Sequence, residues 1–159
     1  MNVQSIESPL GFVIIKEENN TICEISFADA PQENGTKTDI LALAITELQQ
    51  YLNGDLKSFT FPIKQSGTDF QQQVWSTLQE LKFAEVISYT TLAIRMQNLL
   101  AIRAIAAANG KNKIMIAVPC HRVVGMAGEL TGYAGGLWRK QWLLKHEAKI
   151  AGVGQTKLF

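Results

Sequence analysis

The stretch TDFQQQVWSTLQEL, from Thr68 to Leu81, is where the chain changes from one kind of pattern to another. Thr68 and Gln71 have the spacing of a capping box, which satisfies the backbone of a helix's first turn. An apolar stripe at helical spacing follows, formed by Phe70, Val74, Leu78 and Leu81. A linker containing Pro62 and Gly67 precedes the stretch. We therefore predict a helix here and a domain boundary just before it.

The part before this boundary is typical of a small α/β unit. Leu10–Glu17 and Thr21–Ala28 are rich in β-branched residues and partly alternate, which predicts two strands joined by a polar turn. Helical spacing of apolar residues predicts a helix over Asp39–Leu52, ended by Asn53 and Gly54.

The part after it is mainly helical. Thr90–Met96 and Leu100–Asn109 are two short helical candidates whose close spacing suits a helix–turn–helix. The second candidate is almost all alanine and isoleucine, with Arg103 as its one charge. Composition alone favours a buried helix. The other interpretation is a thin helix that lets the backbone approach a partner closely.

Charge is distributed unevenly, although the net charge is only +1. Residues 1–80 carry eleven acidic and four basic side chains, a net of −7, whereas residues 81–159 carry three and eleven, a net of +8. This asymmetry indicates either a nucleic-acid partner for the second half or a solvated basic surface. We see no apolar run long enough for a membrane helix and no export signal, and two cysteines suggest a reducing cytoplasm.

The two cysteines have different surroundings. Cys23 shares one face of its predicted strand with Ile25 and Phe27, so we interpret it as a core side chain and not as a reactive thiol. Cys120 lies in AVPCHRVVG, directly before His121. In an extended segment these neighbours point to opposite sides, so a proton relay between them needs a bridging water. The dipeptide by itself leaves open a tuned nucleophile or a buried thiol, and the chain lacks the spacing of a metal site.

Longer motifs around Cys120 resemble one family closely. They are PCHRVVG at Pro119–Gly125, GYAGG at Gly132–Gly136 and LLKHE at Leu143–Glu147, preceded in order by SPLG at Ser8–Gly11, GTDFQQQVW at Gly67–Trp75, SYTTLA at Ser88–Ala93 and RAI at Arg103–Ile105. The chain, from about residue 8 to residue 147, is similar to the 6-O-methylguanine–DNA methyltransferases, which are single-turnover alkylation-repair proteins. The resemblance implies an α/β fold: a small RNase-H-like domain over residues 1–62, then a mainly helical DNA-binding and active-site domain with a helix–turn–helix over residues 63–159.

The same resemblance implies the chemistry. Cys120 takes the alkyl group from O6 of guanine, and possible activity on O4 of thymine stays open. His121 is then the base, acting through a water, and Glu147 orients and stabilises it. No cofactor and no metal are expected. Arg122 lies inside the motif, but no part of the transfer requires it, so we interpret it as structural.

Further residues take roles from the family pattern. Asn112 holds the turn before the active-site segment, although the family's usual Asn-Pro is Asn112-Lys113 here. Tyr89 donates a proton or a hydrogen bond to the leaving base, and Lys140 supports this polar network. Arg103 fills the gap left by the flipped base. The remaining expected contacts are Ala104 and Ala107 against the minor groove, with Met115, Val123, Tyr133 and Ala134 around the guanine pocket.

These implications define the expected partner and the competing functions. The partner is duplex DNA containing 6-O-alkylguanine, bound by a monomer in the cytoplasm and away from membranes. The alternative is an alkyltransferase-like protein that binds lesions without catalysis, but such proteins typically replace the cysteine that this chain keeps at position 120. A third possibility is a transcription regulator. Members of the family that are fused to regulatory domains carry a metal-binding domain, and 159 residues leave no room for one.

Overall fold

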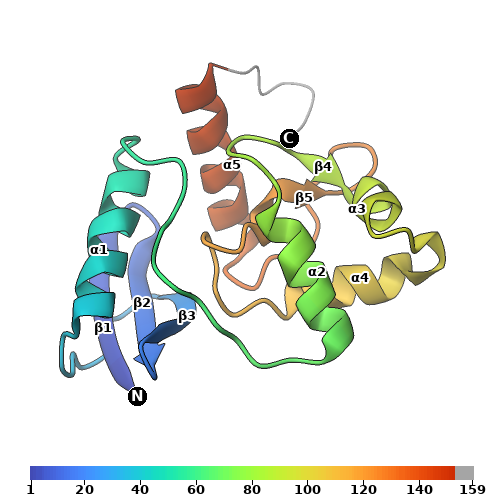
Figure 1. The fold of residues 1–159 in the computed structure, drawn as a ribbon. Coiled ribbons are helices and arrows are strands. Elements are labelled where there is room, and N and C mark those ends of the chain that lie inside the picture. The colour runs from blue at the N-terminus through green and yellow to red at the C-terminus, as the bar shows by residue number, and fades with distance from the viewer. Residues whose placement is uncertain (153–159) are drawn as a thin grey trace. The chain divides into compact units, whose positions relative to one another are not determined.

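The computed structural model describes residues 1–152, which form two compact units (Figure 1). Unit 1 consists of Met1–Ser66 together with Lys113–Ala117. Unit 2 consists of Gly67–Asn112 together with the described residues from Val118 onward. The sequence predicts a division at a single point near residue 62, whereas unit 1 also includes a short segment from the second half of the chain.

Unit 1 is built on an antiparallel sheet of three strands in the order β1-β2-β3. The strands are β1 (Asn2–Ser8), β2 (Gly11–Glu18) and β3 (Thr21–Ala28). Asn19 and Asn20 make the turn between β2 and β3 with φ of 52° and 62°, and asparagine is one of the few residues that tolerate this conformation. The two predicted strands are confirmed. The pattern missed β1, because NVQSIES carries polar side chains on both of its faces.

A β-bulge in β3 changes the position of Cys23. Lys16 of β2 pairs with Glu24, but the next residue of β2 pairs with Ile22, which leaves Cys23 as the extra residue. The alternation therefore breaks, and Ile22 and Ile25 are both fully buried while Cys23 is only half-buried. The prediction of a core side chain is wrong. Burial and two nearby carboxylates raise the pKa of this thiol, which keeps it protonated and unreactive.

The helix of unit 1, α1, spans Asp39–Leu52 as predicted. The Thr38 hydroxyl oxygen accepts a hydrogen bond from the Leu41 N–H at 3.2 Å, which caps the first turn. Gly54 follows the helix with φ of 87°, where a side chain would be strained. The inward face of α1 packs on the sheet (Figure 1) and is formed by fully buried Leu41, Ala44, Leu48 and Tyr51.

Unit 2 is mainly helical. Its elements are α2 (Asp69–Gln79), β4 (Ile87–Ser88), α3 (Tyr89–Arg95), η1 (Leu99–Ala101), α4 (Ile102–Gly110), η2 (Cys120–Arg122), β5 (Val123–Val124) and α5 (Leu137–Ala151). The short strands β4 and β5 pair in parallel. Among residues 1–152, no helix is long and apolar enough to cross a membrane. Our sequence-based expectation of a loose tail from about residue 151 falls mostly on residues 153–159, which lie outside the described part of the chain.

Helix α2 begins with the predicted capping box. The Thr68 hydroxyl oxygen accepts from the Gln71 N–H at 3.1 Å, and the Thr68 N–H donates to Gln71 Oε1 at 2.9 Å. The helix buries Val74, Trp75 and Leu78. The Trp75 indole donates to the carbonyl of Ala108 at 2.9 Å, which joins α2 to α4. Sequence pattern and local hydrogen bonding thus agree on this element.

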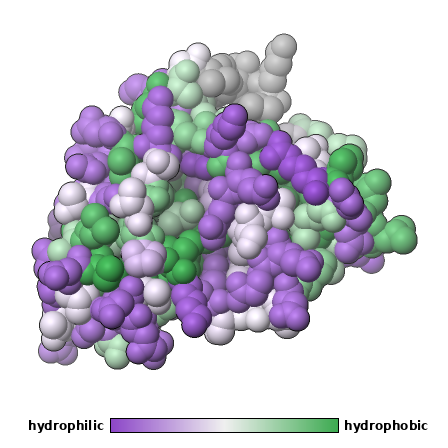
Figure 2. All heavy atoms as spheres, in the orientation of Figure 1, coloured by the Kyte–Doolittle hydropathy of each residue, from purple (hydrophilic) through white to green (hydrophobic). Residues whose placement is uncertain are grey.

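Helices α3 and α4 form the predicted helix–turn–helix, with each end within two residues of the predicted one. Gln97 in the turn has φ of 54°. Ile94, Leu99 and Leu100 are exposed around this turn, and Figure 2 shows apolar surface gathered over it. The turn is therefore more apolar than an ordinary surface turn.

The segment Lys113–Ala117 adds a parallel β-bridge to β3. The Ile25 N–H donates to the carbonyl of Lys113, and the Met115 N–H donates to the carbonyl of Ile25, both at 2.9 Å. The Lys113 N–H donates to Gln65 Oε1 at 2.9 Å, a bond that a proline at this position would lack. Ile116 then reverses the chain with φ of 71°, a strained conformation for a β-branched residue.

Candidate active site

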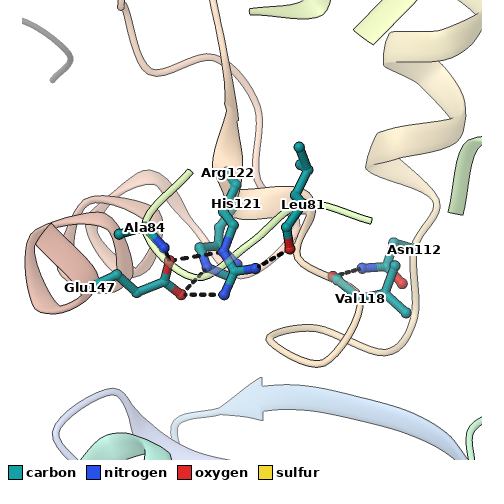
Figure 3. A network of polar contacts seen from close by, with 7 residues as sticks. All are labelled: Leu81, Ala84, Asn112, Val118, His121, Arg122 and Glu147. Atoms are coloured by element: carbon teal, nitrogen blue, oxygen red, sulfur yellow. Dashed lines mark hydrogen bonds and ion pairs between the residues drawn. The ribbon is translucent and has the colours of Figure 1, made fainter. Parts of the chain in front are cut away.

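The turn before Cys120 is held by its own backbone and by Asn112. Pro119 has φ of −82° and ψ of 61°, the conformation of an inverse γ-turn. The Cys120 N–H accordingly donates to the carbonyl of Val118 at 2.8 Å. The same carbonyl accepts a hydrogen bond from Asn112 Nδ2 at 2.8 Å (Figure 3). The chain is thus fixed directly before the residue that carries the thiol.

Residues 120–122 form the short helix η2, not the extended segment that we expected. The reason is local: the γ-turn at Pro119 bends the chain, and the Arg122 N–H then closes a helical turn onto the carbonyl of Pro119 at 3.0 Å. Cys120, His121 and Arg122 are all buried. Within residues 1–152, His121 Nδ1 has no hydrogen-bond partner, so no direct hydrogen bond joins the imidazole to the thiol.

Glu147 on α5 is the centre of a buried ionic network (Figure 3). Its Oε2 lies 2.8 Å from His121 Nε2, and its Oε1 accepts from Arg122 Nε at 2.8 Å. Arg122 also donates from Nη2 to Oε2 at 3.0 Å, and from Nη1 to the carbonyl of Leu81 at 2.9 Å. The Ala84 N–H adds a bond to Oε1 at 3.1 Å. A bidentate guanidinium thus fixes the carboxylate that faces His121.

The charge state of this pair follows from burial and from the network. Burial acts to raise the pKa of Glu147, but the charges and hydrogen bonds of His121 and Arg122 outweigh it and hold this pKa far below its usual range. Burial lowers the pKa of His121, although Glu147 opposes the shift. At neutral pH the pair is a carboxylate and a neutral imidazole. Nε2 then donates to Glu147, and Nδ1 is the ring nitrogen with a lone pair.

The Cys120 thiol is subject to opposing effects. Burial raises its pKa, whereas a hydrogen bond from Asn112 and the positive charge of Lys140 act to lower it. Lys140 on α5 is fully buried and donates to the carbonyls of Thr131 and Gly132 at 2.9 and 3.4 Å. Burial lowers the pKa of Lys140 to about 8, although Cys120 opposes the shift. The site therefore contains a buried cation that favours the thiolate.

Tyr89, the first residue of α3, lies close to the same site. Burial raises the pKa of its hydroxyl, while hydrogen bonds from Thr131 and Asn109 oppose the shift. Asn109 Nδ2 donates to the Tyr89 hydroxyl oxygen at 3.3 Å and to the carbonyl of Cys120 at 3.5 Å. The hydroxyl is therefore protonated at neutral pH and is linked through one amide to the Cys120 backbone.

Two family models together match most of the chain. Residues 69–149 match the DNA-binding domain of 6-O-methylguanine DNA methyltransferase, and residues 1–65 match its ribonuclease-like domain. The chain belongs to the 6-O-methylguanine DNA methyltransferase family. The expected fold, a ribonuclease-like domain followed by a DNA-binding domain, is confirmed.

Curated relatives of this family are named methylated-DNA–protein-cysteine methyltransferases. The Methanosarcina acetivorans protein is 37% identical over 89% of this chain and 94% of its own length. The Mycolicibacterium paratuberculosis protein is 36% identical over 96% of both. The Shigella flexneri protein is 48% identical, but the alignment covers only 65% of this chain and 61% of that protein.

Solved structures of the family agree with the fold. Mycobacterium tuberculosis O6-methylguanine methyltransferase is 34% identical, with a TM-score of 0.84 and 93% of both chains covered. The same organism's OGT in complex with DNA is 33% identical, with a TM-score of 0.85 and 94% of both chains covered.

Helix α4 of this methyltransferase-family chain presents a thin outward face. Arg103, Ala104 and Ala107 are exposed, whereas the opposite face buries Ile105, Ala108 and Asn109. Composition alone favoured a buried helix, but the structure buries only one face of α4 and exposes the other. Short side chains flank one cation on the exposed face, as close approach to a groove requires.

The residues expected around the guanine pocket lie in different parts of the fold. Val123 is fully buried in β5, and Met115 is buried in the segment that belongs to unit 1. Tyr133 is half-buried and Ala134 exposed, both in the loop before α5. Burial raises the pKa of the Tyr133 hydroxyl well above its usual value, so this group is neutral. Their contact with a base stays a prediction.

Two residues have larger roles in the site than the sequence indicated. Arg122 is structural as interpreted, but it also holds the carboxylate that faces His121. An arginine inside an otherwise apolar motif requires an anionic partner when it is buried, and this requirement could have pointed to a carboxylate. Asn109 was not among our candidates. Its signal was weak: an amide on the otherwise apolar inward face of α4.

Proposed function

We propose that this protein repairs DNA by moving an alkyl group from O6 of guanine in a duplex to its own Cys120, in a single turnover and without a cofactor. The observation that carries the proposal is the buried thiol of Cys120 beside the His121–Glu147 pair, in a chain of this family. Curated relatives at high coverage are named for the same activity.

The first step is activation of the thiol. A neutral His121 with its Nδ1 lone pair available is the base, and a bridging water carries the Cys120 proton to it. Glu147 stabilises the resulting imidazolium through the 2.8 Å contact. The charge of Lys140 and the Asn112 hydrogen bond stabilise the thiolate.

The transfer step is a displacement at the alkyl carbon. A bond forms between Cys120 Sγ and this carbon, the bond from the carbon to O6 breaks, and the electron pair stays on the guanine. The Tyr89 hydroxyl donates a hydrogen bond or proton to the departing base. The proton that His121 took from the thiol returns to solvent, and Tyr89 regains from solvent any proton it has given, so the net reaction moves one proton from the thiol to guanine. The product thioether has no thiol left, so the reaction stops after one turnover.

The lesion lies inside a duplex and must rotate out of the stack to reach a buried thiol. Helix α4 enters the minor groove with its exposed face, where Ala104 and Ala107 permit close approach and Arg103 occupies the space left by the base. Met115, Val123, Tyr133 and Ala134 form the walls around the extruded guanine. Basic side chains supply affinity for phosphates. We also propose that the protein acts as a monomer in the cytoplasm, where free thiols such as its own persist.

The first experiment is the mass of the intact protein after mixing with a short duplex that contains one 6-O-methylguanine. We expect one added methyl group per chain, located on Cys120 by peptide mapping. Cys120→Ala should bind the duplex but gain no methyl group. Cys23→Ala is the matched control and should react like the wild type.

Two results would contradict the proposal: methyl transfer by Cys120→Ala, or a wild-type chain that binds the duplex tightly and stays unmodified. The second result would favour a lesion-binding protein without catalysis.

A further inference from the structure

Asn109 is a buried amide in an apolar setting. It lies on the inward face of α4 beside Ile105 and Ala108, and only 4% of its surface is exposed. An amide at such a position is tolerated when its polar atoms find partners, because its transfer from water is otherwise unfavourable. The partners of Asn109 therefore indicate why an amide stands there.

Those partners are two residues of the proposed reaction. Asn109 Nδ2 lies 3.3 Å from the Tyr89 hydroxyl oxygen and 3.5 Å from the carbonyl of Cys120. A carbonyl can only accept, so the atom facing it must be the NH₂ group, and this fixes the orientation of the amide. The Tyr89 oxygen then accepts from Asn109. Its single proton cannot point at Asn109.

The other polar atom of Asn109 argues against a purely stabilising role. Oδ1 is buried and has no hydrogen-bond partner among residues 1–152. A half-satisfied amide stabilises a fold less than a well-packed leucine, which has the same branched shape. A buried amide with an unsatisfied oxygen, placed between the two residues of the transfer step, is typical of a functional site.

We propose that Asn109 is a positioning residue for alkyl transfer, because its Nδ2 occupies an acceptor site of the Tyr89 hydroxyl and so leaves the Tyr89 proton for the departing base. The inference rests on the proposed function and deepens it. Asn109 does not touch the alkyl group. It acts through Tyr89 and, more weakly, through the Cys120 carbonyl.

The test separates DNA binding from the transfer step in Asn109→Leu. Asn109 is buried and lies on the face of α4 opposite Arg103, so the dissociation constant for a duplex with one 6-O-methylguanine should not change. The transfer rate constant at saturating duplex should fall about tenfold, a part of what a general acid contributes. Asn109→Ala, which cannot clash, should behave in the same way if leucine does not pack.

A second measurement places both substitutions in a Tyr89→Phe background. A residue that acts through the Tyr89 hydroxyl should cause no further loss there, whereas a residue that only supports the fold should cause the same loss in both backgrounds. Gln4→Leu is the matched control, since Gln4 is a buried amide in unit 1 whose Nε2 donates to the carbonyl of Gly35 at 2.8 Å. It should keep the wild-type transfer rate.

The inference is overturned if both Asn109 variants transfer at the wild-type rate, if their losses are equal in the two backgrounds, or if duplex affinity falls together with rate. Methylation of Cys120 in the wild-type chain is measured in the same series. Its absence would refute the proposed function, whereas a reactive wild type with unaffected variants would refute the inference about Asn109 alone.

Discussion

A buried carboxylate is stable only when a cation or hydrogen bonds compensate its negative charge. At Glu147, Arg122 provides most of this compensation. The guanidinium binds both carboxylate oxygens and the Leu81 carbonyl, and lies 5.9 Å from the centre of the Phe83 ring. His121 is neutral and adds no full charge to balance the carboxylate. Arg122 is therefore the residue on which the orientation of the His121–Glu147 pair depends.

We expect Arg122→Met to lower the free energy of unfolding by about 3–5 kcal/mol, because it leaves a carboxylate buried without its cation. Urea denaturation measures this loss. Arg95→Met is the matched control: Arg95 pairs with Glu85 at 2.6 Å, but both side chains are about one-third exposed. That substitution should cost about 0–1 kcal/mol. Equal losses in the two variants would show that the buried network does not stabilise the fold.

At the scale of elements, the outward face of α4 makes its own prediction. Arg103→Ala should lower the rate of methyl transfer from duplex DNA about tenfold or more, since extruding a base costs a few kcal/mol that the arginine helps to recover. Transfer from free 6-O-benzylguanine, which needs no extrusion, should not change. Single-turnover rates on the two substrates measure the difference.

The control for Arg103 is Lys149→Ala, which removes an exposed positive charge of α5 in the same unit. It should reduce both rates little. Equal losses by Arg103→Ala on the duplex and on the free base would rule out the proposed role.

Elements with local signals were predictable from the sequence. The capping box at Thr68 and the Asn-Gly stop after α1 set helix ends that the structure confirms. Two features without such signals were not predictable. Strand β1 is polar on both faces and is fixed by pairing with β2 and by hydrogen bonds to Asn34 and Gly35, and the bulge at Cys23 depends on a pairing register that no single strand contains.

At the scale of the whole molecule, stability should depend on pH through the buried pair. The pKa of Glu147 is lowered in the folded chain, so its ionised form stabilises the fold above the unfolded value of about 4.3, and this stabilisation is lost as pH falls. The pKa of His121 is lowered as well. Protonation of the unfolded chain below about pH 6.5 therefore acts in the same direction.

We expect the stability margin of the wild type over Glu147→Gln to shrink as pH is lowered from about 4.3 toward 3, where the carboxylate of the unfolded wild type becomes protonated. Urea denaturation of both proteins over this range measures the margin. A margin that stays constant or grows between about pH 4.3 and pH 3 would contradict the lowered pKa of Glu147.

The site was predictable from the sequence only in part. A reading of the residues alone identified Cys120 and His121 as neighbours and could not choose between a nucleophile and a buried thiol. Glu147 stands 26 residues after His121, and no periodicity links them; the resemblance supplied that residue. The amide of Asn109 gives only a weak signal in the sequence, since its partners Tyr89 and Cys120 meet it only after folding.

The segment Lys113–Ala117 has a consequence for how the chain can be divided. The polypeptide leaves unit 2 after Asn112, pairs with β3, and returns at Val118, two residues before Cys120. A fragment starting at Gly67 would carry this segment without its strand, with Ile114 and the backbone edge unmatched. The segment that carries Cys120, the proposed alkyl acceptor, therefore should not fold as an independent fragment. We expect the two halves of the chain to act instead as a complementing pair, in which residues 1–66 supply the strand that orders the segment before Cys120.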